Sequence, residues 1–173
     1  MKRLLMTMTA ITALGIVSLS DAATSVVNSN QCQRLAGTTT PFLLVLKKGE
    51  DLKKSIERCA INAKLKSASI SGLGALQNTT LNYFNHAKKT YQKKRYPQFL
   101  ELLAINGNLS TLNGKPFTHL HVTLSDANYH TIGGHLDNAQ VGATVELTIV
   151  PVENALVRKY DEQTGLMLIK SQQ

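Results

Sequence analysis

The segment Phe117–Leu124 alternates apolar and polar side chains, and this pattern constrains the fold more than any other part of the sequence. A period of two is typical of a β-strand that has one face against a core and the other face outward. The segment therefore predicts a half-buried strand. Its inward side chains are expected to be Leu120, Val122 and Leu124, and its outward side chains His119, His121 and Thr123.

Further strands are predicted wherever short apolar or alternating runs are bounded by turn residues. They cover Phe42–Leu46, Ser67–Leu76, Thr79–Asn85, Phe99–Leu109, Thr131–Leu136, Ala143–Val150, Leu156–Lys159 and Leu166–Ile169. Asn113-Gly114 predicts a tight turn, and a helix with Asp51 as its N-cap is expected over residues 51–64. Short connections favour antiparallel pairing. The chain therefore predicts an α+β domain, with a mostly antiparallel, barrel-like sheet and one main helix.

The first residues predict a leader rather than a part of the fold. Lys2 and Arg3 precede an uncharged apolar stretch, and Ser20-Asp21-Ala22 places small residues around a cleavage site after Ala22. This pattern is typical of a signal peptide, here over residues 1–22. An uncleaved membrane anchor is the alternative, although the apolar stretch is short for a membrane span. We expect residues 23–40 to form a polar, extended arm, residues 41–170 to form the domain, and the protein to be periplasmic or secreted.

Two cysteines, Cys32 and Cys59, occur in the chain. In an oxidising compartment such a pair favours one disulfide, which would link the N-terminal arm to the predicted helix. The alternative is two unpaired thiols, one of them buried as a small apolar side chain.

The composition bears mainly on possible partners. The formal net charge of +8 favours anionic partners such as nucleic acid or phospholipid. Part of it is local, because five basic residues follow the strand predicted over Thr79–Asn85: Lys88, Lys89, Lys93, Lys94 and Arg95. We interpret this cluster as a solvated loop. The absence of tryptophan and the 5% aromatic content argue against a base-stacking surface for single-stranded nucleic acid.

The two outward histidines of the alternating strand are predicted to meet a third. His119 and His121 share one face, roughly 7 Å apart along the strand. If the following turn is centred on Asn128, His121 lies directly opposite His135, and directly opposed residues share a face. Three histidines with an open fourth position predict a catalytic type of zinc site. The ion would acidify a bound water or polarise a carbonyl group.

Other residues leave alternatives open. The histidines could line a polar pocket without a metal. Glu101 and Glu146 interrupt apolar strands, so each either faces solvent or serves the site as a catalytic acid, base or orienting group. His86 and His130 stand alone near loops and are expected to be solvated.

Several motifs resemble one known family, the PPC domain (plants and prokaryotes conserved), in its stand-alone bacterial type. The resemblance covers residues 42–169 in the family's order, and the histidine segments are its most specific part. The matching segments are Lys48-Gly49-Glu50-Asp51-Leu52, Ile70–Leu76, Glu101–Leu109, His119–Asp126, Gly133-Gly134-His135-Leu136 and Thr144-Val145-Glu146-Leu147.

The resemblance implies an α+β fold that assembles as a homotrimer. That fold is similar to the fold of alpha-acetolactate decarboxylase, a zinc enzyme with a three-histidine site, and by this analogy His119, His121 and His135 would be the ligands. The family is often labelled DNA-binding because its plant members carry AT-hooks. No Arg-Gly-Arg-Pro segment of that kind occurs here.

The sequence also departs from the family pattern. Val45-Leu46-Lys47 stands where the family has an arginine on its first strand, and Ala75 replaces a usual serine. Three functions stay open at this point. They are a metal-dependent enzyme, such as a lyase or hydrolase, or a small-molecule binder; a DNA-binding protein; and a non-catalytic trimeric interaction module.

Overall fold

The computed structural model of the protein describes residues 24–170, so the signal peptide predicted over residues 1–22 lies outside the described part. Residues 24–170 form nine strands, one α-helix and one short 3₁₀ helix. In chain order these are β1 (Ser25–Asn28), η1 (Cys32–Leu35), β2 (Phe42–Lys47), α1 (Leu52–Asn62), β3 (Ala68–Asn85), β4 (Thr90–Tyr96), β5 (Leu100–Leu112), β6 (Lys115–Ser125), β7 (Thr131–Pro151), β8 (Arg158–Asp161) and β9 (Leu166–Ile169).

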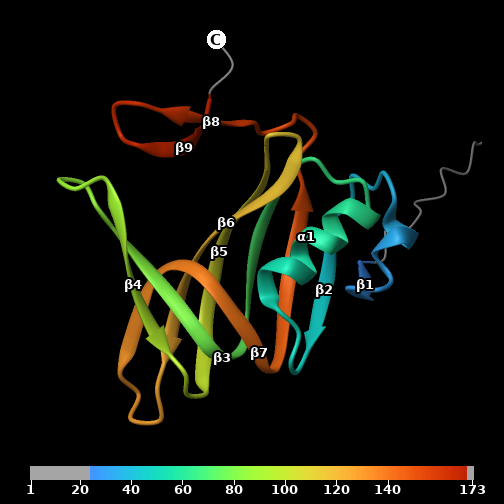
Figure 1. The fold of residues 1–173 in the computed structure, drawn as a ribbon. Coiled ribbons are helices and arrows are strands. Elements are labelled where there is room, and N and C mark those ends of the chain that lie inside the picture. The colour runs from blue at the N-terminus through green and yellow to red at the C-terminus, as the bar shows by residue number, and fades with distance from the viewer. Residues whose placement is uncertain (1–23, 171–173) are drawn as a thin grey trace, which may run out of the picture.

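Seven strands make one sheet that closes on itself. Their order is β1-β2-β7-β6-β5-β3-β4, and β3 also pairs with β7, so that β3, β5, β6 and β7 form a closed circuit (Figure 1). All pairs are antiparallel except β1 with β2. The strands β8 and β9 form a separate hairpin. The predicted α+β class, with a mostly antiparallel, barrel-like sheet and one main helix, is confirmed.

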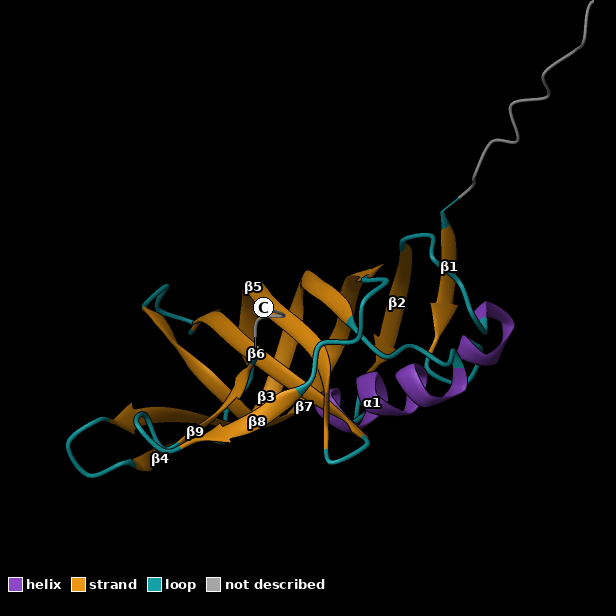
Figure 2. Cartoon of the chain, turned by 90° about the horizontal axis from the view of Figure 1, so that it is seen from above, coloured by secondary structure: helices purple, strands orange, loops and turns teal. Residues whose placement is uncertain are grey.

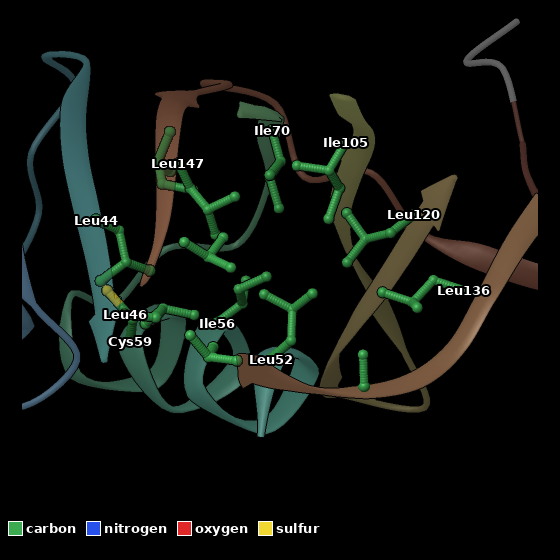
Figure 3. Close-up of a cluster of buried hydrophobic side chains, with 14 of the residues drawn as sticks. Leu44, Leu46, Leu52, Ile56, Cys59, Ile70, Ile105, Leu120, Leu136 and Leu147 are labelled. Atoms are coloured by element: carbon green, nitrogen blue, oxygen red, sulfur yellow. The ribbon is translucent and has the colours of Figure 1, made fainter. Parts of the chain in front are cut away.

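The helix α1 covers one side of this sheet (Figure 2). Its N-cap is Asp51, as predicted, and the Asp51 side chain accepts a hydrogen bond from the backbone N–H of Lys54. The apolar face of α1 carries Leu52, Ile56 and Cys59, which pack onto the buried side chains of the sheet (Figure 3). Burial of these side chains drives the packing, at roughly 25 cal/mol per Å² of apolar surface removed from water. Within residues 24–170 no helix has the length and apolar character needed to cross a bilayer.

Two strands run longer than the sequence pattern predicts. The segments Ser67–Leu76 and Thr79–Asn85 are one strand, β3, and Thr131–Leu136 and Ala143–Val150 are one strand, β7. The predicted breaks are shifts in register, for example between Gln77 and Thr80 where β3 pairs with β7. A β-bulge bends a strand without ending it. The interruptions in alternation therefore mark the bends that close the barrel, not turns.

The basic cluster is also not a loop, contrary to the prediction. Lys93, Lys94 and Arg95 belong to β4, which pairs with β3 along one edge of the sheet. Only Lys88 and Lys89 lie in the turn that joins the two strands. Charged side chains on an exposed edge strand discourage pairing with other chains, which explains why a polar sequence can occupy a strand here.

The segment predicted as an extended arm is attached to the domain. Ser25–Asn28 pairs in parallel with β2 as an edge strand, and η1 follows it. Cys32 and Cys59 form a disulfide with a Cα–Cα distance of 5.2 Å, which ties η1 to α1. A bridge across 27 residues is expected to stabilise the fold by about 3 kcal/mol.

Candidate metal centre

The three histidines come together on the outer face of the β6–β7 hairpin. His121 pairs directly with His135 in the ladder between these strands, which is the register predicted from the turn. The predicted faces of β6 also hold, because Leu120, Val122 and Leu124 are buried while His121 is exposed. The local sequence is therefore sufficient to bring the three rings to one place.

The three rings form a nearly equilateral triangle. Their centroids are 5.2 Å apart for His119 and His121, 5.0 Å for His119 and His135, and 5.3 Å for His121 and His135. One ring nitrogen from each histidine lies within 4.8 Å of the other two. A zinc–nitrogen bond of about 2.0–2.1 Å places a ring centroid roughly 3.2 Å from the ion, so tetrahedral ligands would have centroids about 5.2 Å apart. The triangle therefore fits one zinc ion.

The environment keeps two of these rings neutral. Burial lowers the pKa of His119 to about 4, and the charges of Arg158, His121 and Lys53 act in the same direction. Burial also lowers the pKa of His135 to about 4, with further contributions from His119, His121 and Lys53. A neutral imidazole has the free lone pair that a metal needs. The donor set is thus ready to bind a metal at neutral pH.

These shifts predict how the stability of the metal-free protein depends on pH. The unfolded chain takes up protons at its histidines below pH 6.5, whereas folded His119 and His135 take them up only near pH 4. The free energy of unfolding should therefore fall as the pH decreases from 6.5 to 4. Urea unfolding in the presence of a chelator measures this slope, and the variant His119→Gln/His135→Gln should flatten it. An unchanged slope in that variant would contradict the assignment.

Gly107 lets β5 approach the backbone of β6 at the first histidine. Gly107 pairs with Leu120, the residue after His119. A Cβ atom at position 107 would overlap the backbone carbonyl of His119 and lie 2.9 Å from the Cα of Leu120. Only glycine fits this close approach. The position of His119 therefore depends on a residue of the neighbouring strand.

Arg158 anchors the β8–β9 hairpin beside the histidines. Only 6% of Arg158 is exposed. Its guanidinium donates to the side chains of Ser110 and Asn108 and to the backbone carbonyl of Met167, at 2.8–2.9 Å. It also lies 3.1 Å from Nδ1 of His119. A buried arginine needs such partners, and here they come from β5, β6 and β9, so this one side chain connects the hairpin to the barrel.

The contact between Arg158 and His119 has a consequence for metal binding. A guanidinium can only donate, so Nδ1 of His119 accepts, and the neutral ring carries its proton on Nε2. A metal on Nδ1 would use the lone pair that Arg158 now occupies. A metal on Nε2 would move the proton to Nδ1, where it would face the arginine N–H. In both cases a metal bound to His119 would break the hydrogen bond between Arg158 and Nδ1 of His119.

The histidines lie in a cleft of about 640 Å³. Its walls come from α1, the β3–β4 hairpin, β6, β7 and the β8–β9 hairpin. Asp137 is the only acid among the described residues that line it. Burial opposes ionisation of Asp137, but the hydrogen bond and charge of Lys93, at 2.9 Å, outweigh this and lower the pKa of Asp137. The cleft therefore has no carboxylate free of a cationic partner.

The predicted carboxylates do not join the cluster. Glu101 lies at the start of β5, where it pairs with Ser125 of β6. Glu146 of β7 pairs with Val45 of β2 and Leu73 of β3. Both side chains are exposed and neither lines the cleft. An acid in an apolar strand can face solvent on the outer side of a barrel, and here both do so. We therefore assign neither residue to the metal centre.

The two remaining histidines, His86 and His130, are both exposed. His130 is exposed in the turn after β6, 3.4 Å from Asp126, as expected for a solvated side chain. His86 is exposed too, as expected, but it also lies at the cleft and packs edge-on against Phe84, which no local sequence pattern predicts. Sequence reasoning also missed Arg158 and Lys53, because neither stands in a motif. Both reach the cleft from segments remote from the histidines.

A protein-family model described as the Plants and Prokaryotes Conserved (PCC) domain matches residues 33–153 of the chain. Among curated proteins, the bifunctional protein GlmU of a Synechococcus strain is 31% identical over 134 residues. This match covers 76% of the chain but 20% of GlmU, so the chain spans about a fifth of the length of this relative.

Solved structures share the fold over most of their length. A metal-containing protein from Archaeoglobus fulgidus is 38% identical with a TM-score of 0.71, and the match covers 76% of this chain and 94% of that one. A plant- and prokaryote-conserved protein from Pyrococcus horikoshii is 28% identical, with a TM-score of 0.72 and coverage of 78% and 93%. A protein from Bacteroides thetaiotaomicron, named as a candidate DNA-binding protein, is 25% identical, with a TM-score of 0.73 and coverage of 77% and 93%.

Proposed function

The chain belongs to the Plants and Prokaryotes Conserved domain family. From this premise we propose that the protein uses a bound metal ion to bind a small molecule or to catalyse its reaction. In this proposal His119, His121 and His135 hold a divalent transition metal, with zinc as the first candidate. The observation that carries it is the triangle of rings with centroids 5.0–5.3 Å apart. The metal-containing relative from Archaeoglobus fulgidus, at 38% identity, supports a metal of unspecified identity.

The chemistry proposed for the site is that of a lyase or a hydrolase, or of a binder without turnover. A bound zinc ion would supply Lewis-acid chemistry. The residues of this chain would hold the metal in the cleft, line one side of it with the β8–β9 hairpin, and supply positive charge through Lys53 and Arg158. Asp137 is engaged by Lys93, so the proposal does not use a carboxylate base.

Metal analysis of the purified protein tests this proposal. Under zinc-replete conditions the wild type should carry close to one metal ion per chain, and the variant His119→Ala/His121→Ala should carry almost none. Circular dichroism should show that the variant remains folded, because His121 is exposed and His119 is only half-buried. A wild type without near-stoichiometric metal would end the proposal.

A second candidate function is nucleic-acid binding. The observation that favours it is the exposed edge strand β4, which carries Lys93, Lys94 and Arg95. The relative from Bacteroides thetaiotaomicron is named as a candidate DNA-binding protein. Lys93 is already paired with Asp137, which leaves two basic side chains for phosphates. A salt-titrated binding assay decides: a steep fall of DNA affinity with salt would favour this function, and no measurable DNA binding would remove it.

We also propose export and a trimeric assembly, as expected from the leader pattern and the family resemblance. The exposed side chains of Leu73 and Leu103, at 56% and 53%, support an interface. Both residues lie where the register between β3 and β5 shifts. The shift falls between the pairs Gly72–Ile105 and Gly74–Leu102. Sedimentation equilibrium should give three times the chain mass, and Leu73→Lys/Leu103→Lys should give a smaller species. A monomeric wild type would contradict the trimer.

A further inference from the structure

The charges that line the histidine cleft do not balance. Lys53, Lys93 and Arg158 are basic, whereas Asp137 is the only acid among the described lining residues. Lys93 and Asp137 neutralise each other at 2.9 Å. Between residues 24 and 170, neither Lys53 nor Arg158 forms a salt bridge with a carboxylate. Two cations therefore face the cleft without an anionic partner, and a bound metal ion would add to the excess.

Both cations lie against the same aromatic ring. Nζ of Lys53 is 5.9 Å from the centroid of the Phe117 ring, and Cζ of Arg158 is 5.2 Å from it. Phe117 is on β6, two residues before His119. Aromatic rings attract cations through their faces, so Phe117 holds the two positive charges near the metal ligands. One wall of the cleft therefore carries two positive charges, those of Lys53 and Arg158, close to the apolar ring of Phe117.

A second wall of the cleft is apolar and comes from β9, the strand that pairs with β8 and its Arg158. Leu166 and Leu168 alternate on β9 and line the cleft. The hairpin lies beside the tip of the β3–β4 hairpin in both views (Figures 1 and 2), where Nζ of Lys89 donates to the backbone carbonyl of Glu162 at 2.8 Å. Residues 158–169 follow the segment that matches the family model, which ends at residue 153.

Metal loading changes what Arg158 offers. One of its amino groups now donates to Oδ1 of Asn108 at 2.9 Å and faces Nδ1 of His119 at 3.1 Å. Because a metal on His119 would exclude the second contact, one N–H of this group would become free beside the metal site. The other contacts of Arg158, to Ser110 and Met167, keep the guanidinium in place. A fixed, free N–H of a guanidinium is a strong donor to a carboxylate.

We propose that the cleft binds an organic carboxylate with an apolar body. The carboxylate lies beside the metal and is recognised by Lys53 and Arg158, and the apolar body packs between Phe117 and the Leu166–Leu168 wall. This inference rests on the proposed metal function and names the class of ligand for the same site. Lys53 and Arg158 determine the charge of the ligand, and Leu166 and Leu168 of β9 determine its apolar character.

Calorimetric titration of the zinc-loaded protein with three probes tests both parts of the proposal. Benzoate has the charge and the apolar ring, benzamide has the ring without the charge, and acetate has the charge without the ring. Benzoate should bind at least about tenfold more tightly than each of the other two. Equal affinity for benzamide would overturn the recognition of charge, and equal affinity for acetate would overturn the role of the apolar wall.

Two neighbouring lysines provide a matched pair of variants. Lys53 lines the cleft, whereas Lys54 faces Asp51 at 3.6 Å outside it. Lys53→Gln should weaken benzoate binding by about fivefold, and Lys54→Gln should leave it unchanged. Neither change removes a buried hydrogen bond, so both proteins should fold. Equal effects of the two variants would overturn the role of Lys53.

The metal content of each sample separates this inference from the proposed function. If the wild type binds no zinc, the proposed function fails, and the same titrations are made on the metal-free protein. Lys53 and Arg158 are present there too, so benzoate should still bind more tightly than benzamide, and Lys53→Gln should still weaken it. Loss of that preference would overturn the inference as well.

Discussion

Replacing His135 with alanine is expected to lower the zinc affinity by more than about a hundredfold. This loss is larger than the loss of about 10–100-fold that is typical when a hydrogen-bond partner of a metal ligand is replaced. The substitution removes one of three protein ligands, and no other histidine or carboxylate among residues 24–170 belongs to the cluster of potential metal ligands. Competition with a chromophoric chelator measures the affinity. His121→Ala should have a similar effect, since His121 and His135 are direct partners in the ladder.

His130→Ala is the matched control for this experiment. His130 belongs to the same hairpin, is exposed, and contacts Asp126 instead of the cluster. Its replacement should leave the zinc affinity unchanged. If His130→Ala and His135→Ala weakened zinc binding equally, the metal would not be held by the cluster, and surface histidines would explain the affinity.

The second large effect is expected at Gly107. Gly107→Ala should lower the free energy of unfolding by about 3 kcal/mol or more, because the new methyl group overlaps the backbone of His119, which cannot move without parting β5 from β6. The same displacement should weaken zinc binding, since His119 moves with its strand. Urea unfolding and the chelator competition measure the two effects on one sample.

Gly134→Ala provides the comparison. Gly134 also lies next to a histidine of the cluster, but a Cβ atom there would be 3.4 Å from the backbone oxygen of Asn82 and 3.6 Å from Cβ of Leu81. These are near-ordinary contacts, so the change in stability should stay within about 1 kcal/mol. Equal stability of Gly107→Ala and Gly134→Ala would show that β5 does not restrain His119 in the way the structure indicates.

The histidine cluster could be predicted because its causes are local. A strict alternation fixes the face of His119 and His121, and a short turn fixes the partner of His121. The N-cap at Asp51 is predictable for the same reason, since the cap and the N–H group it accepts are three residues apart. Features that depend on a single turn or a single strand can therefore be predicted from the local sequence.

The bends of the sheet could not be predicted in this way. The breaks in alternation after Leu76 and after Leu136 look like strand ends, but they are irregularities in register where β3 and β7 pair with each other across the barrel. That pairing joins residues far apart in the chain, and no local pattern records it. For the same reason the basic residues of β4 gave no sign of strand structure, because the partner strand β3 determines it.

The walls of the cleft were also beyond local reasoning. Arg158 is remote in sequence from His119, and its role follows from a hairpin that docks onto β5 and β6 through Ser110 and Asn108. Glu101 and Glu146 show the opposite case. Their acidic side chains in apolar strands suggested a site, whereas the closed barrel offers an outer surface on which both can face solvent. A barrel has two faces, and alternation alone does not say which one carries the function.

X-ray absorption spectroscopy of the zinc-loaded protein tests the central claim most directly. We expect the ion to be bound by three imidazole nitrogens at about 2.0–2.1 Å, with the multiple-scattering signature of histidine, and to lose one of them in His135→Ala. A shell made only of water and carboxylate oxygens, or a spectrum that does not change in His135→Ala, would contradict the assignment of His119, His121 and His135 as the metal ligands.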